Sequence, residues 1–174
     1  MNFDLNHSID LLSRTPETLR TLLAGLPNDF VRSDEGDNTW SPYEVLGHLI
    51  HGEKTDWVPR AQIIISDRAD KTFEPYDRFA QQQADQSRSI EVLLDEFASL
   101  RAQNLETLKA MNIMEAKLDK TGIHPALGTA TLRELLATWT THDLGHIAQI
   151  ARVMAKQYQS EVGPWKAYLG ILKA

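Results

Sequence analysis

The residues best suited to chemistry are two histidines four positions apart, His142 and His146. On a helix, residues at this spacing lie on one face with Cβ atoms about 5–6 Å apart, so both imidazoles can bind one metal ion. Because leaving a buried polar group unpaired costs about 1–3 kcal/mol, two rings in a core-facing stripe need polar partners. A metal ion would satisfy both rings, and so would hydrogen bonds from neighbouring side chains. The apolar stripe that they interrupt comprises Leu132, Leu135, Leu136, Trp139, Ile150 and Val153.

A third histidine ligand must come from elsewhere in the chain. The remaining histidines are His7, His48, His51 and His124. The first lies near the N-terminus and the last in a predicted loop, whereas His48 and His51 share one predicted helix. His48 is closer to the apolar residues Val45 and Leu49 on the helical wheel. The apolar arc of this helix is broad, so periodicity alone leaves the choice between His48 and His51 open.

The ligand set predicts the chemistry of such a site. Three neutral imidazoles leave at least one coordination position open, which in catalytic zinc sites holds a water with a pKa near ~7. The same position can bind and ionise a thiol. Imidazole suits zinc, nickel, iron and copper, so we expect one divalent ion whose identity stays open. Glu53 and Asp143 are candidates to orient the imidazoles or the water, or else solvated carboxylates of a helix surface.

Other interpretations of the histidine pair do not fit. A zincin protease needs His-Glu-x-x-His, and here Asp143 stands in place of the glutamate. A di-iron bundle needs inward glutamates and Glu-x-x-His pairs, and Trp139 stands where that glutamate would precede His142. The chain has no cysteine, which excludes thiolate ligands and disulfides.

Four segments with helical apolar periodicity would position these residues. They span about 5–26, 41–65, 89–114 and 131–158, and we predict an all-α, antiparallel four-helix bundle with no sheet. Ser41 with Glu44, and Thr131 with Glu134, form capping boxes at two helix starts. Pro16 and Pro59 should interrupt or kink their helices. Polar stretches at 67–76 and 121–129 are predicted to be connections.

The composition fits one globular domain over residues 1–174. Hydrophobic residues make up 42% of the chain and charged residues 24%. No apolar run approaches ~18 residues, so we expect no membrane-spanning helix. The net charge is −6 and basic residues do not cluster, so nucleic-acid binding is not expected. The lack of cysteine and of a secretory pattern at 1–7 fits a cytoplasmic protein.

Two segments resemble signatures of the DinB/YfiT-like superfamily of metal-binding four-helix bundles. WSPYEVLGHL at 40–49, followed by Glu53, resembles the second-helix signature, and HDLGHIAQI at 142–150 resembles that of the fourth helix. LSRTP at 12–16 is similar to the start of the family's first helix, so the likeness covers most of the chain. The resemblance implies three metal ligands, His48, His142 and His146. Many members have Glu where this chain has Asp143, which leaves the ligands intact but puts a role for that carboxylate in doubt.

The resemblance also implies a function. Some relatives are thiol-dependent transferases that use low-molecular-weight thiols, and hydrolysis is a variant within the same class of metal-dependent enzyme. The alternative is a non-catalytic metal-binding stress-response protein, and a third hypothesis is an interaction protein whose site has decayed. Relatives are often dimers, so a homodimer is expected. An open coordination position and an adjoining pocket would favour the enzyme.

Overall fold

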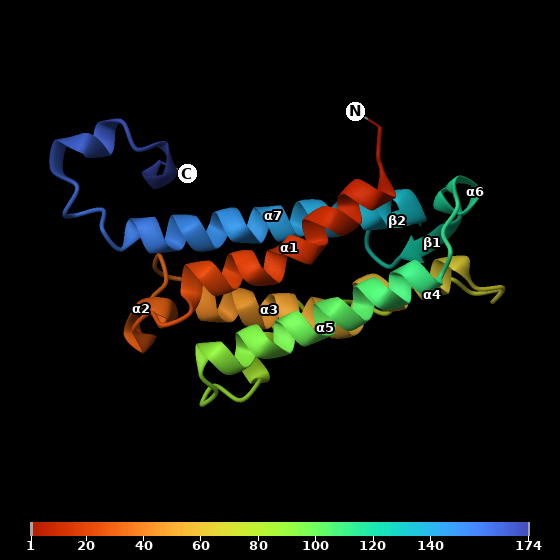
Figure 1. Cartoon of the computed structure of the whole chain (residues 1–174), viewed down its shortest axis with the longest axis horizontal. Helices are drawn as coiled ribbons and strands as arrows, with labels where there is room; N and C mark the ends of the chain where they lie inside the picture. Colours follow the sequence, from red (N-terminus) through yellow and green to blue (C-terminus); the bar gives the residue numbers. More distant parts are fainter. Residues whose placement is uncertain (1, 174) are drawn as a thin grey trace.

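The computed structural model describes residues 2–173, which form a four-helix bundle (Figure 1). The long helices are α1 (Leu5–Leu23), α3 (Pro42–Thr55) continued by α4 (Trp57–Ile65), α5 (Ile90–Ala110) and α7 (Leu132–Lys156). In Figure 1, α1 and α7 run in one direction, and α3 and α5 run in the other. Each of these four helices packs against two of the others. The predicted helical bundle is therefore confirmed.

The two predicted capping boxes begin the helices that carry the histidines. At the start of α3, the Ser41 hydroxyl accepts from the Glu44 amide, and the Glu44 carboxylate accepts from the Ser41 amide at 2.9 Å. At the start of α7, Thr131 and Glu134 form the same pair, with the return bond at 2.7 Å. Satisfying otherwise unpaired amides in this way fixes where each helix begins.

The two prolines, both predicted to interrupt or kink a helix, have different effects. Pro16 does not interrupt α1, which continues through it. Proline cannot donate to the carbonyl four residues earlier, which here belongs to Leu12, and that oxygen accepts instead from Nη1 of Arg101 at 2.8 Å. The second helix is interrupted at Asp56, before Pro59. Pro59 thus lies in the first turn of α4, where its missing N–H would have no partner within the helix.

The segment predicted as a loop at 121–129 is a β-hairpin, which corrects the expectation of no sheet. Strands β1 (Thr121–His124) and β2 (Gly128–Thr131) pair antiparallel. Ile123 also exchanges two backbone hydrogen bonds of 2.9 Å with Lys71 and Phe73, in the long connection between α4 and α5. A Cβ at Gly122 would lie 2.4 Å from the Phe73 ring, so glycine permits this approach. Strands of four residues are too short to show a period-two apolar pattern.

The core consists of two apolar clusters separated by a polar layer. One cluster includes Leu12, Trp57 and Trp139, and the other includes Leu46 and Phe97. Along each long helix, a buried polar residue lies between the parts that belong to the two clusters. These residues are Thr15 on α1, Glu53 on α3, Arg101 on α5 and Asp143 on α7.

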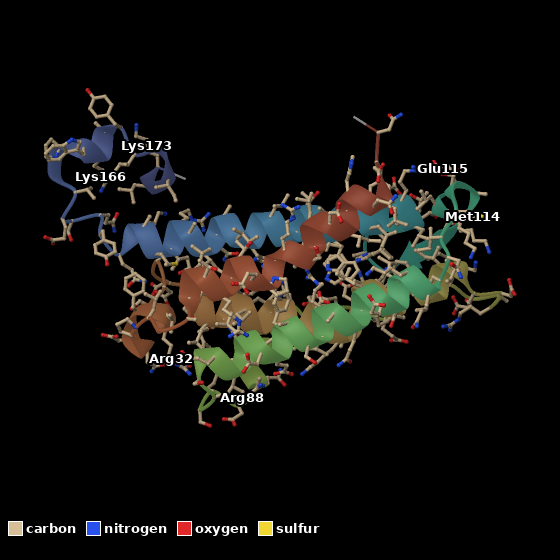
Figure 2. The ribbon with its side chains drawn as sticks, in the orientation of Figure 1. Arg32, Arg88, Met114, Glu115, Lys166 and Lys173 are labelled. Atoms are coloured by element: carbon tan, nitrogen blue, oxygen red, sulfur yellow. The ribbon has the colours of Figure 1, made fainter. Side chains whose placement is uncertain are left out.

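Short elements lie between and beyond the long helices. They are α2 (Asn28–Arg32), η1 (Ala80–Gln83), α6 (Glu115–Leu118), η2 (Gly163–Ala167) and η3 (Gly170–Leu172). Figure 2 shows Arg32 and Arg88 at one end of the bundle and Glu115 at the other. Nη2 of Arg32 donates to the Arg88 carbonyl at 3.1 Å, which ties α2 to the approach to α5. Among the described helices, none is long and apolar enough to cross a membrane.

Candidate metal centre

Three histidines from two helices meet inside the bundle. His48 lies on α3, and His142 and His146 lie one turn apart on α7. Nε2 of His142 is 3.1 Å from Nε2 of His48 and 3.1 Å from Nε2 of His146. One ligand atom from each ring lies within 4.8 Å of the others. The structure therefore brings together the three residues that the family resemblance predicts as ligands.

The donor set fits a divalent metal ion better than hydrogen bonding alone. Two nitrogens bound to one tetrahedral ion at about 2.0–2.1 Å lie roughly 3.4 Å apart, close to the separations seen here. Nε2 of a neutral imidazole has either one hydrogen or one lone pair, so His142 would have to share it between two partners. Its other nitrogen, Nδ1, is buried without a hydrogen-bond partner in the described part of the chain. Hydrogen bonds thus leave the central ring poorly satisfied, whereas an ion at Nε2 would use its lone pair.

Neighbouring side chains orient the outer two rings. Nδ1 of His146 lies 2.8 Å from Oε1 of Gln149, which can only accept, so Nδ1 has the hydrogen and Nε2 the lone pair. Tyr76 Oη lies 3.3 Å from Nδ1 of His48. The indole of Trp40 covers the His48 ring, with centroids 4.9 Å apart. These contacts hold the Nε2 atoms toward one another.

Burial keeps the rings neutral. It is the largest cause that lowers the pKa of His48 to about 4 and the pKa of His142 to about 3, and His146 nearby lowers both further. Burial also lowers the pKa of His146, against the opposing effects of Gln149 and Asp143. Because a metal ligand must offer an unprotonated nitrogen, these shifts favour metal binding at neutral pH.

Among the described residues, Glu53 and Asp143 make no hydrogen bond to the imidazoles, and neither is solvated. Each is 2% exposed, and both pair with Arg101, which is 1% exposed. Asp143 accepts from Arg101 at 2.7 and 3.2 Å. Glu53 accepts from Arg101 at 2.8 Å, from Asn104 at 2.9 Å and from Trp139 at 3.2 Å. The interpretation as solvated carboxylates is therefore wrong, because both are buried and paired with a cation.

Sequence reasoning missed Arg101, although its place in an apolar stripe of α5 indicates a buried arginine. Phe97, Arg101 and Leu105 recur at intervals of four residues on the buried face of α5. An arginine in such a stripe requires buried carboxylates. The two acidic residues on the histidine-bearing helices are those partners.

The other histidines lie outside the group. His51 is half-buried, and its Nε2 lies 3.4 Å from the hydroxyl of Thr55 one turn along α3. His124 accepts backbone N–H bonds within the hairpin turn, and His7 is exposed. Periodicity leaves open whether His48 or His51 lies near the two α7 histidines. The structure shows that it is His48. Metal ligation itself stays a prediction.

A cavity of about 540 Å³ adjoins the histidines. Of the three rings, only that of His146 lines it. The walls also include Trp40, Arg78, Gln149 and Arg152. The described residues place no fourth histidine or carboxylate in the candidate ligand group. An ion at this site would therefore keep a position for a ligand from outside the chain.

Comparisons with known proteins agree with this architecture. The sequence model of the DinB superfamily matches residues 11–150, a span that includes all three histidines. No curated protein matches the chain. One similar solved structure is YfiT from Bacillus subtilis, described as a probable metal-dependent hydrolase with an unusual four-helix bundle topology. The two share 17% sequence identity with a TM-score of 0.71, over 91% of this chain and 87% of YfiT, a likeness of fold.

Proposed function

The chain belongs to the DinB superfamily, and from that premise we propose that it is a metal-dependent enzyme whose divalent ion is held by His48, His142 and His146. One observation carries the proposal. Three imidazole Nε2 atoms converge at 3.1 Å contacts beside a cavity, without a fourth ligand side chain in the described group. Three protein ligands with an open position are typical of catalytic rather than structural zinc sites.

When bound, a divalent ion supplies a Lewis acid that lowers the pKa of water or of a thiol at its open position. The chain's own groups prepare the site for that chemistry. Gln149 fixes the tautomer of His146, and the rings of Trp57 and His142 pack edge to face with centroids 5.0 Å apart. Trp40 and Tyr76 enclose His48. Substrate reaches the centre from the side of His146, where the cavity lies.

The substrate is a small electrophilic molecule, and the reaction is hydrolysis or transfer to a low-molecular-weight thiol. Both reactions use the same ion and differ in the nucleophile. The fold is shared with a protein named a probable metal-dependent hydrolase, while the family resemblance of the two histidine motifs points to thiol transfer. A cytoplasmic location and a homodimer remain part of the proposal.

A non-catalytic metal-binding role is less well supported. A purely structural ion is usually enclosed by four protein ligands, and here the described group has three beside a cavity. The bundle also has two apolar clusters and an ion-paired Arg101 layer, so it does not need an ion to form a core. These features favour the enzyme.

The test begins with metal content. Protein purified without a histidine tag is analysed by mass spectrometry for metals, and metal-free protein is then loaded with zinc, nickel or iron. We expect one ion per chain. The loaded protein is screened with activated esters in water, and with electrophilic aryl halides and a panel of thiols. Turnover that requires the metal in one of the two screens supports the proposal, and His51→Ala serves as the matched control for His48→Ala. A chain that binds no ion with all three histidines intact contradicts it.

A further inference from the structure

The cavity beside His146 has an unusual charge for this protein. The chain has a net charge of −6, yet the cavity walls include two arginines, Arg78 and Arg152, and no carboxylate. Amide side chains of Asn38 and Gln82 add neutral hydrogen-bonding groups. We infer that this cavity binds the carboxylate of a small organic substrate between Arg78 and Arg152, with the flat apolar part of the substrate against Trp40 and Phe79. The inference rests on the proposed function, because it assigns a substrate class to the same site.

Arg152 is held in place from behind, with donors left for a ligand. Its Nε donates to Oε1 of Glu35 at 2.7 Å. The Glu35 side chain is 7% exposed and also accepts from Lys156 at 3.0 Å. Glu35 is thus shared by Arg152 and Lys156. The terminal Nη atoms of Arg152 have no hydrogen-bond partner among the described residues, and a guanidinium offers such paired donors to a carboxylate in a fork geometry.

Arg78 also lines the cavity and is more exposed than Arg152. It lies in the connection between α4 and α5 and has no ion pair within the described part of the chain. Its guanidinium carbon is 5.8 Å from the ring centroid of Trp40 and 5.2 Å from that of Phe79. Contact with ring faces leaves the in-plane N–H groups of a guanidinium available to an anion.

The aromatic walls favour an organic anion over an inorganic one. Trp40 and Phe79 meet edge to face with centroids 6.2 Å apart, and Phe79 is 48% exposed. Trp40 also packs against the ring of His48. The cavity lining therefore combines two cationic groups, apolar ring surfaces and a predicted metal ligand. This combination suits a molecule that has a carboxylate, a flat apolar part and a reactive group.

The test uses benzoate as probe, benzamide as its neutral counterpart and inorganic phosphate as the competing anion. Binding is followed on metal-free protein by NMR, through the indole N–H resonance of Trp40. Benzoate should bind at least about tenfold more tightly than benzamide or phosphate. Arg78→Gln should weaken benzoate about tenfold or more, the effect expected for loss of a charged hydrogen bond. Arg152→Lys keeps the charge beside Glu35 but loses the fork, so its loss should be smaller.

The matched control is Arg68→Gln, an exposed arginine of the same connection outside the cavity, which should leave benzoate affinity unchanged. Equal affinities for benzoate and benzamide, tighter binding of phosphate, or benzoate binding that is insensitive to both cavity variants would overturn the inference. Metal stoichiometry is measured on the same samples. Arginine-dependent benzoate binding without metal binding would leave the anion site standing and remove the proposed enzyme. Metal binding without benzoate binding would do the reverse.

Discussion

Asp143 directly follows His142 on α7, and it binds Arg101 through both carboxylate oxygens, at 2.7 and 3.2 Å. Arg101 also binds Glu53 on α3, the helix of His48. The ion-paired layer therefore joins the two histidine-bearing helices through α5. The same ion pairs that contribute to the stability of the core therefore also hold the helices of His48 and His142 beside each other.

Removing Arg101 should destabilise the protein strongly. Arg101→Met leaves two buried carboxylates without their cation, and breaking a buried pair in this way costs about 3–5 kcal/mol. We expect a fall of that size in the free energy of unfolding, measured by urea denaturation. Arg14→Met, at an exposed position of α1, is the control and should change it by less than about 0.5 kcal/mol. A loss below about 1 kcal/mol for Arg101→Met would show that the layer is not a stabilising unit.

Metal binding should distinguish His48 from His51. His48→Ala removes a nitrogen of the candidate group, whereas His51 lies outside it. Calorimetric titration with zinc should show loss of the tight site in His48→Ala and in His142→Ala. His51→Ala should keep one ion per chain with unchanged affinity. Loss of zinc binding in His51→Ala but not in His48→Ala would contradict the prediction and would show that His51 is the ligand on α3.

The bundle should fold without an ion and gain stability from one. A chain of this length buries enough surface to sustain a core unaided. An ion that binds only the native state adds RT ln(1 + [L]/Kd), about 2.7 kcal/mol at a hundredfold excess over Kd. Dialysis against a chelator should therefore lower Tm, and added zinc should restore it. Loss of helical circular dichroism on chelation at 25 °C would contradict this expectation.

The metal-free protein should lose stability as pH falls below about 6.5. The native pKa of His48 is about 4 and that of His142 about 3, below the value in the unfolded chain. Between these limits the unfolded state binds more protons, so stability rises with pH, by about 1.4 kcal/mol per pH unit for each histidine. Urea denaturation from pH 4 to 7 measures the slope. His142→Asn should flatten it, and an unchanged slope in that variant would assign the effect to other groups.

Local sequence signals account for much of the fold and for part of the site. The capping pairs Ser41–Glu44 and Thr131–Glu134 are short-range patterns with a direct physical cause, and the structure contains both. The spacing of His142 and His146 likewise indicates a shared face. His48 required the family resemblance, because a broad apolar arc does not distinguish two histidines three residues apart. The ligands themselves remain predictions until an ion is observed.

The features that were missed depend on contacts between distant segments. The fate of Glu53 and Asp143 is set by Arg101 on a third helix, 48 and 42 residues away in the chain. Likewise, α1 continues through Pro16, where Arg101 bonds the carbonyl of Leu12 that this proline cannot serve. The hairpin depends on pairing of Ile123 with the connection between α4 and α5. No periodicity within one segment encodes these partners.

The central claim is tested most directly by a crystal structure of the zinc-loaded protein with anomalous data at the zinc edge. The account predicts one peak within about 2.0–2.1 Å of Nε2 in His48, His142 and His146. The remaining coordination should come from a non-protein ligand on the side of the cavity. A peak elsewhere, or an ion enclosed by four protein ligands, would contradict the account.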